Sequence, residues 1–399
     1  MPVSGEVAIV GAGVTPFGVL HEMSYLDLIA ESATAAIADA GVSLDLVEAA
    51  WLGTAEPLTA GLVGDSGAAV AQAIDFAPRP VTRVSNFCTS GMEAVRAAAM
   101  AIAAGEHDVV MAIGAEKMRD VTPRGSLVAK TAEQTHPTLA KGRTAPGQFA
   151  LLANRYMHEY GATMEDLARV AVKNHGNANR NPKAHFHHDL SVADVLNAPR
   201  VAEPLGLYDC TPTTDGGATV IMASREWAES NARRYALIEG MGLAVTGGYY
   251  SNFFDGKSDY LGFESTRAAA AKAYEQAGIT NPREELDVLE CHDCFTITEI
   301  VNTEDLGIAE PGGGVALLRS GATSFGGDIP VNLSGGLQAC GHPVGATGVR
   351  MIAEIFNQVT GEAGDRQVEG AKRGLAHTLG GPGVIASVIV LGSPAARQM

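Results

Sequence analysis

The sequence predicts an α/β protein built from two similar halves. Hydrophobic residues make up 46% of the 399 residues and glycines number 47, which is enough for a sizeable core with many tight turns. Residues 1–116 and 234–399 show the same order of strand-like and helix-like patterns, separated by a more polar and less regular segment. We interpret this as a duplicated α/β unit, with three unrelated domains as the alternative.

In the first half the patterns alternate between strands and helices. Ser24, followed three residues later by Asp27, is typical of a helix start because each side chain can bond the backbone N–H of the other residue. Gly41 after an alanine-rich run is typical of a helix end. The elements expected here are strands at 7–13, 49–53 and 109–114, and helices between Ser24 and Gly41 and at 92–104.

The second half is predicted to repeat this order. An alanine-rich helix is expected at 265–277 and ends at Gly278. The glycine-rich run around His342 is expected to open another helix, which covers 349–359. The expected strands cover 236–245, 287–291 and 384–391, and residues 374–380 lead towards the last of them.

Charge and cysteine content limit the classes of partner and compartment. The formal net charge of −17 disfavours nucleic acids and anionic membranes. Met1 to Val10 lack the pattern of a signal peptide, and the absence of any apolar run of about 18 residues argues against a membrane span. The odd number of cysteines, five, suits the reducing cytoplasm, and residues 397–399 are not a peroxisomal signal.

Cys88 is the first candidate for chemistry. It stands in the run NFCTSG, residues 86–91, directly before the predicted helix at 92–104. A thiol at a helix N-terminus meets unpaired N–H groups and the positive end of the helix dipole, which favour the nucleophilic thiolate. A buried structural cysteine is the commoner fate of such a residue.

His342 is the second candidate. It lies in the run SGGLQACGHPVGATG, residues 334–348, where many glycines allow the backbone to pass close to a ligand. An isolated histidine is more often structural. This one occupies the loop of the second half that corresponds to the loop of Cys88, and a nucleophilic thiol needs a base to take its proton.

The run CHDCF, residues 291–295, ends an apolar strand. Zinc would need a second pair of ligands at similar spacing, and a redox pair would normally open a helix with Gly or Pro inside. The remaining interpretation is a strand-end site in which His292 donates a hydrogen bond and Cys294 moves protons, since open α/β sheets place chemistry at such ends.

Other signals are weaker. Gly11 and Gly13 follow a strand, but Pro16 takes the place of the third glycine of a dinucleotide fingerprint, which rejects that interpretation. His185, His187 and His188 form a cluster, for which a solvated loop is favoured over a metal site. Cys210 and Cys340 have no evident partners. Asp215-Gly216-Gly217 is expected to be a simple turn. We expect no metal.

Together these motifs resemble those of the thiolase superfamily. The matching pieces are CTSG from Cys88, HDCF from His292, GHPxGATG from Gly341, and Gly380-Gly381, and they span essentially the whole chain. The HDCF version is similar to sterol-carrier-protein-type thiolases and related archaeal and bacterial thiolases, whereas other thiolases carry NEAF at this place.

The resemblance implies a five-layered α/β fold with an inserted loop domain. The first half would comprise residues 1–116 and about 220–233, the loop domain 117–219 and the second half 234–399. It also implies a homodimer or homotetramer, a possible small accessory protein, coenzyme A and acyl-CoA as substrates, and no permanently bound cofactor.

Carried over by motif, the resemblance also implies roles. Cys88 would be the acylated nucleophile, His342 would activate it and line a first oxyanion hole, and His292 would help form that hole. Cys294 would be the second acid/base. Gly380 would supply a backbone N–H, beside that of Cys88, for a second oxyanion hole.

The chain departs from a common thiolase pattern near its C-terminus. Thr378 stands where many thiolases have their second cysteine, and Pro382 replaces the third glycine of the same motif. The implied activity is thiolytic cleavage of 3-oxoacyl-CoA or the reverse Claisen condensation. The alternatives are a retro-aldolase acting on steroid side-chain CoA thioesters, a β-ketoacyl synthase, and a non-catalytic subunit that binds CoA thioesters.

Overall fold

The computed structural model describes residues 3–56, 65–121, 144–247 and 259–394. Nine strands in these ranges are hydrogen-bonded side by side in the order β3-β2-β4-β7-β1-β8-β11-β10-β9. Their bounds are β1 Val7–Val14, β2 Ala49–Gly53, β3 Val81–Val84, β4 Val109–Glu116, β7 Gly216–Ser224, β8 Ala236–Val245, β9 Val288–Glu290, β10 Arg373–Gly380 and β11 Ile385–Gly392.

The strands of the two halves form two blocks that meet at a narrow seam. In the first block β2 is parallel to β3 and β4, and β7 is antiparallel to β4 and β1. In the second block β9 is parallel to β10, and β11 is antiparallel to β8 and β10. The seam between β1 and β8 consists of two residue pairs, Ala8 with Leu237 and Ile9 with Ala236.

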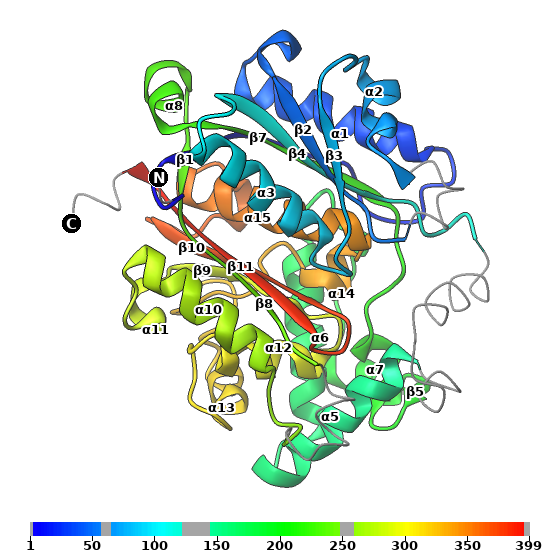
Figure 1. Ribbon diagram of the computed structural model, residues 1–399. Coiled ribbons are helices and arrows are strands. Elements are labelled where there is room, and N and C mark those ends of the chain that lie inside the picture. The colour runs from blue at the N-terminus through cyan, green and yellow to red at the C-terminus, as the bar shows by residue number, and fades with distance from the viewer. Residues whose placement is uncertain (1–2, 57–64, 122–143, 248–258, 395–399) are drawn as a thin grey trace.

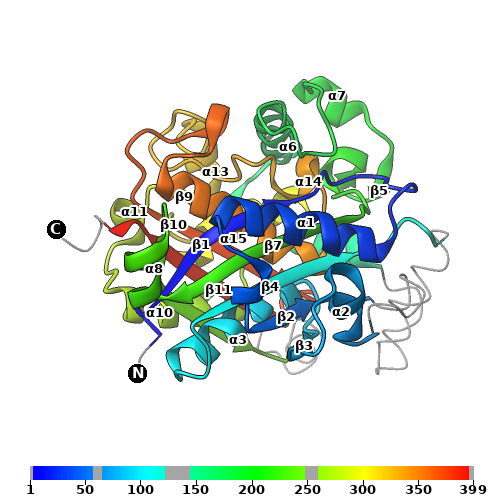
Figure 2. The same ribbon diagram turned by 90° about the horizontal axis from the view of Figure 1, so that it is seen from above.

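Helices cover both outer faces of the blocks and fill the space between them. The helix α1 packs on β1 and β7, whereas α10 packs on β8 and β11 (Figures 1 and 2). Between the blocks lie α3 and α15, and α15 contacts strands of both (Figure 1). The bounds are α1 Tyr25–Ala40, α3 Ser90–Ala103, α10 Glu264–Ala277 and α15 Val344–Thr360. This arrangement confirms the predicted five-layered α/β fold with two similar halves.

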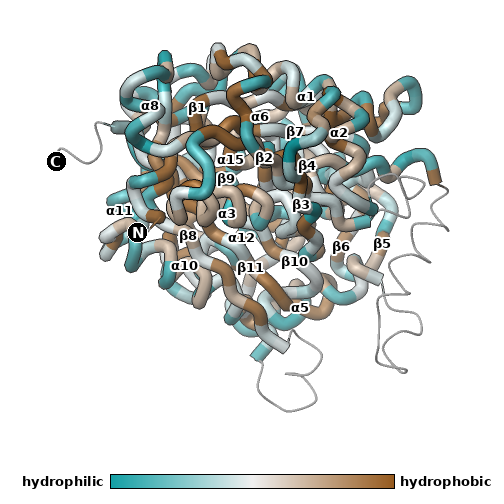
Figure 3. The backbone as a smooth tube through the Cα atoms, turned by 45° about the horizontal axis from the view of Figure 1, so that its top comes forward, coloured by the Kyte–Doolittle hydropathy of each residue, from teal (hydrophilic) through white to brown (hydrophobic). Residues whose placement is uncertain are grey.

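Local signals in the sequence fix the helix ends. The side chain of Ser24 accepts from the Asp27 N–H and the carboxylate of Asp27 accepts from the Ser24 N–H, so the predicted cap is confirmed. Gly41 and Gly278 both adopt left-handed backbone at the C-terminal ends of their helices. Hydrophobic stretches follow the inner strands and helices, and hydrophilic ones lie at the outside (Figure 3). None of the helices in the described ranges is long and apolar enough to cross a membrane.

One segment without an assigned element is a strand, and one local expectation is wrong. Residues 374–380 are themselves a strand, β10, because they pair with β9 on one side and β11 on the other. Asp215-Gly216-Gly217 is no simple turn, since Gly216 begins β7 and the carboxylate of Asp215 is buried. That carboxylate accepts from Lys117 Nζ at 2.7 Å and from the Met118 N–H at 2.7 Å.

The segment between the two halves forms a helical layer at one end of the molecule (Figure 1). It contains α5 Ala145–Tyr160, α6 Met164–Ala178, α7 Val192–Asn197 and a hairpin of β5 Arg200–Ala202 with β6 Leu205–Gly206. The division of the chain at 117, 219 and 233 stays a prediction. The strand β7 runs through residue 219 without interruption.

Glycines allow α3 and α15 to approach each other and β4 at backbone distance. A Cβ added to Gly91 on α3, or to Gly114 on β4, would collide with the carbonyl oxygen of Gly345 on α15. A Cβ on Gly348 would lie 2.5 Å from the backbone nitrogen of Met92. Only glycine fits at these positions, and its lack of a side chain allows the helices that follow Cys88 and His342 to pack in direct contact.

We therefore expect Gly114→Ala to destabilise the fold by roughly 1–3 kcal/mol or more, because backbone atoms must move to admit the methyl group. The matched control is Gly176→Ala on α6, where an added Cβ meets no atom within 4 Å. That change should stabilise by about 0.4–1 kcal/mol. Chemical denaturation of both variants measures the difference, and equal stabilities would contradict the packing argument.

Candidate active site

Cys88 lies in a tight turn immediately before α3. Phe87 adopts a left-handed backbone conformation with φ 49°. The hydroxyl of Ser90 accepts from the Asn86 N–H at 2.8 Å and donates to the Phe87 carbonyl at 2.6 Å, which locks the turn. Cys88 is half-buried. The turn therefore presents the thiol at the start of the helix in a fixed orientation.

His342 is held at the start of α15 from both its backbone and its ring. Its N–H donates to the hydroxyl of Thr214 at 2.8 Å, and its Nδ1 lies 2.7 Å from the hydroxyl of Thr347. Because the Thr347 hydroxyl donates its proton to the Pro343 carbonyl, it accepts from Nδ1–H of His342. In the neutral ring the other nitrogen, Nε2, then carries no proton and can act as a base.

His292 and Cys294 lie in the connection from β9 to the helix α12, Thr296–Asp305. The strand covers Val288–Glu290, so the expected strand at 287–291 is one residue too long at each end. The N–H of His292 donates to His377 Nδ1 at 3.4 Å, and the His292 carbonyl accepts from Asn302 at 2.7 Å. These two contacts fix the loop from the strand side and from the helix side.

The fold brings these side chains together from both halves. The sulfur of Cys88 and one ring nitrogen each of His292 and His342 lie within 4.8 Å of one another. The two imidazole rings meet edge to face, with centroids 5.2 Å apart. A Cβ on Gly380 would lie 3.3 Å from the Cys88 nitrogen, so the end of β10 packs directly on the Cys88 turn.

Burial sets the protonation states of the surrounding groups. It lowers the pKa of His292 well below its ordinary value, and the neighbouring His342 and His377 lower it further. Burial also lowers the pKa of His377 to about 3. For Cys294, burial and the nearby Cys88 raise the pKa well above that of a free thiol. At neutral pH His292 and His377 are therefore uncharged and Cys294 carries its proton.

Comparison with known proteins assigns both halves to one family. Residues 7–226 match the thiolase N-terminal domain and residues 249–393 match a thiolase C-terminal domain-like family.

The chain belongs to the thiolase family. It is 40% identical to an acetyl-CoA acetyltransferase of Methanothermobacter thermautotrophicus, over 96% of this chain and 98% of that protein. It is 33% identical to human sterol carrier protein 2, over 98% of this chain and 73% of that protein. The solved structure named "Ltp2-ChsH2(DUF35) aldolase" has a TM-score of 0.84 at 29% identity and covers 98% of this chain and 99% of its own.

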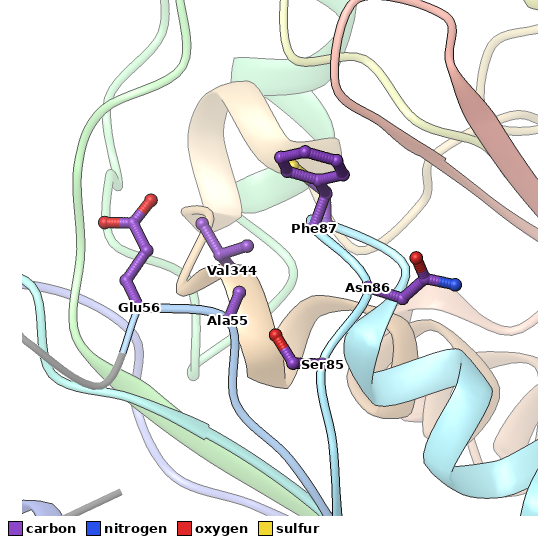
Figure 4. A pocket seen from close by; sticks show the side chains of 7 residues that line it. Ala55, Glu56, Ser85, Asn86, Phe87 and Val344 are labelled. Carbon is purple, nitrogen blue, oxygen red and sulfur yellow. The ribbon is translucent and has the colours of Figure 1, made fainter. Parts of the chain in front are cut away.

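Two adjoining pockets in this thiolase reach Cys88. The larger, of about 340 Å³, also reaches His292, Cys294 and His342, and its walls include Phe149, Phe295 and Cys210. The smaller, of about 260 Å³, is lined by residues around the Cys88 turn and the start of α15 (Figure 4). In Figure 4, Val344 lies between Glu56 and Phe87, and all three residues line both pockets.

Several groups at the site had no assigned role in the sequence. Thr214, Thr347 and His377 act on the site through hydrogen bonds, and Cys210 reaches the pocket from the segment between the halves. Thr347 stands in the motif of His342, whereas Thr214, His377 and Cys210 lie far along the chain from the residues that they meet. The one available hint was His377, a polar residue within an apolar strand.

Cys88, His292 and His342 are also the one His/Cys/Asp/Glu cluster in the described ranges that is close enough to hold a metal ion. Thiolate and neutral imidazole are ligands that zinc accepts. The expectation of no metal stays a prediction. His187 and His188 are exposed and His185 is half-buried, as a solvated loop would be.

His377 makes stability depend on pH. Its pKa is about 3 in the folded protein and near 6.5 when unfolded, so the unfolded chain gains a proton that the folded chain refuses as pH falls below 6.5. Each pH unit below 6.5 lowers the free energy of unfolding by about 1.4 kcal/mol for one such group, which amounts to about 2 kcal/mol at pH 5.

His377→Asn keeps an acceptor for the His292 N–H but removes the titration. Urea unfolding at about pH 7.5 and about pH 5 should show a smaller acid loss for this variant than for wild type. An equal loss in both proteins would contradict the assignment.

Proposed function

We propose that this thiolase is an acyltransferase that cleaves 3-oxoacyl-CoA with free coenzyme A, or runs the reverse Claisen condensation, through an acyl-Cys88 intermediate. The observation that carries the proposal is the convergence of the Cys88 sulfur with the ring nitrogens of His292 and His342. This set combines a thiol with a base, as covalent acyl transfer requires.

In the first half-reaction His342 Nε2 takes the thiol proton, and the Cys88 sulfur attacks the keto carbon. The C–C bond to the α-carbon breaks, the acyl group stays on the sulfur, and the departing enolate takes a proton to become acyl-CoA. In the second half-reaction the thiol of free coenzyme A loses its proton and attacks the thioester. Cys88 then leaves as thiolate and takes back the proton held by His342, so atoms and charge balance over the cycle.

Each half-reaction places negative charge on an oxygen. His292 is held neutral by burial, so one ring N–H can donate to such an oxygen without the ring acting as an acid. The backbone N–H of Cys88, beside Gly380 on β10, is suited to a second oxyanion hole. Neutral donors in a water-poor pocket stabilise developing charge more than the same donors would in bulk water.

Cys294 is proposed as the second acid/base. It lines the pocket with Cys88, and its raised pKa keeps it protonated until a stronger base forms. A carbanion or enolate beside a thioester is such a base. The thiol can protonate it and later recover a proton from incoming coenzyme A.

A retro-aldolase is the second candidate, because the solved relative named as an aldolase shares this fold over nearly the whole chain. Retro-aldol cleavage consumes no coenzyme A and leaves no acyl group on Cys88. Thiolysis consumes coenzyme A and passes through an acyl group on Cys88. A steroid side-chain CoA thioester bearing a hydroxyl on the β-carbon, supplied without free coenzyme A, would distinguish the two, because a retro-aldolase cleaves it whereas thiolysis requires a keto group at that carbon. A non-catalytic subunit would bind either substrate unchanged.

The setting of the enzyme is also proposed. We infer a homodimer or homotetramer in the cytoplasm, with coenzyme A and acyl-CoA as substrates and no permanently bound cofactor. A small accessory protein is consistent with the name of the solved aldolase, which includes a DUF35 component. Sedimentation analysis of the purified chain measures the oligomeric state directly.

Removal of the nucleophile tests the central claim. Cys88→Ala should abolish acetoacetyl-CoA thiolysis, and acetyl-CoA should leave an acetyl group on the Cys88 peptide of wild type as detected by mass spectrometry. The same peptide of Cys88→Ala, and wild type without acetyl-CoA, should remain unmodified. Near-normal thiolysis by Cys88→Ala would end the proposal.

Removal of His292 tests the oxyanion role. His292→Ala should lower kcat by about 100- to 1000-fold, the usual effect of losing one oxyanion donor, while Cys88 can still be acylated. His107→Ala, which removes a histidine paired with Glu48 outside the pocket, is the control and should retain its kcat. Retained turnover in His292→Ala would count against this role.

A further inference from the structure

Asp293, the residue between His292 and Cys294, joins their loop to the loop that carries His342. Asp293 is buried, and its Oδ1 accepts from the Leu337 N–H at 2.6 Å. Leu337 belongs to the short helix α14, Gly336–Cys340, which ends two residues before His342. A movement of the Asp293 carboxylate would therefore be transmitted to His342.

The contact between Asp293 and α14 leaves no free space. Gly336 adopts φ +61°, and a Cβ added there would collide with the carboxylate of Asp293. Oδ2 of Asp293 also accepts from the backbone N–H of Gln338 at 3.4 Å. The two loops thus meet through one carboxylate at close range.

Asn174 on α6 holds this carboxylate from the segment between the two halves. Its Nδ2 donates to Asp293 Oδ2 at 2.8 Å and to Glu299 Oε2 at 2.9 Å. Its Oδ1 accepts from Lys173 Nζ at 2.8 Å, which fixes the orientation of the amide. Both amide hydrogens are therefore directed at carboxylates.

Charge explains why an amide is needed here. Asp293 and Glu299 are buried acids that share Asn174 as a hydrogen-bond donor, with one ammonium, that of Lys173, 2.9 Å from Glu299 Oε1. Burial, and next the neighbouring Glu299, raise the pKa of Asp293 above its ordinary value. Without the amide, two buried carboxylates would have to separate, or one would take up a proton.

Glu299 connects the same cluster to a second point on the His342 segment. Its Oε2 accepts from Asn332 Nδ2 at 2.7 Å, and Asn332 Oδ1 accepts from the Cys291 N–H at 2.9 Å. The strand-end loop and the segment that leads to His342 are thus joined at two places.

We propose that Asn174 is a positioning residue, which fixes Asp293 and Glu299 and thereby the placement of His292 and Cys294 relative to His342. The inference rests on the proposed thiolysis. It gives the segment between the halves a direct part in catalytic geometry, although Asn174 touches neither substrate nor reacting atoms.

Asn174→Ala tests the proposal against Asn154→Ala. The control removes an exposed asparagine of α5 whose Nδ2 bonds two backbone carbonyls, those of Ala150 and Glu203. Misplacement of catalytic groups by about 1 Å can cost about 100-fold, so Asn174→Ala should lower kcat by about 10- to 100-fold with little change in KM. Asn154→Ala should behave as wild type.

Hydrogen exchange followed by mass spectrometry gives a readout independent of turnover. Peptides that cover residues 334–342 should exchange faster in Asn174→Ala, because Leu337 N–H loses a fixed acceptor, and should be unchanged in Asn154→Ala. Asn174→Ser, which keeps a small polar side chain, repeats the test if the alanine variant does not fold.

The outcomes separate the two proposals. Absence of thiolysis by wild type would reject the proposed function. An active wild type together with normal kcat and normal exchange in the Asn174 variants would overturn the positioning role. A general loss of melting temperature with unchanged kcat would also overturn it, because Asn174 would then be merely structural.

Discussion

The close contact between α3 and α15 is the constraint on which the site depends. Each helix begins two residues after a residue of the site, Cys88 for α3 and His342 for α15, and each belongs to a different half of the chain. Glycines at 91, 114 and 345 let backbone meet backbone where these helices and β4 cross. Side chains at those places would separate the helices and so move the thiol away from the imidazole.

A second requirement is that the groups around Cys88 stay uncharged until the reaction begins. Burial achieves this for His292, His377 and Cys294. The acidic side chains of Asp293 and Glu299 lie behind the site, where Asn174 donates to both and Lys173 forms an ion pair with Glu299. The pocket is thus prepared for negative charge that develops on substrate oxygens.

Local signals made much of this fold predictable. The cap at Ser24, the glycine helix ends and the apolar strands depend on neighbouring residues, so their positions were clear from the sequence. Cys88 and His342 were recognisable because each stands among glycines before a helix. His377, Thr214 and Asn174 were not, since their partners lie far away in the sequence and only the packed fold brings them together. The strand over residues 374–380 is not evident from the sequence, because two glycines, His377 and Thr378 interrupt its apolar pattern.

The place of the second cysteine gives the HDCF loop its importance. Thr378 stands where many thiolases have a cysteine. It is buried, and its hydroxyl points to the sulfur of Met92 on α3. A proton donor for the enolate must then come from elsewhere in the pocket, and Cys294 lines it. The proposed oxyanion donor, His292, and the proposed proton donor, Cys294, therefore share the loop of residues 291–295, with Asp293 between them. An error in that loop would displace both groups at once, which explains why the loop is hydrogen-bonded to β10, α6, α12 and α14 together.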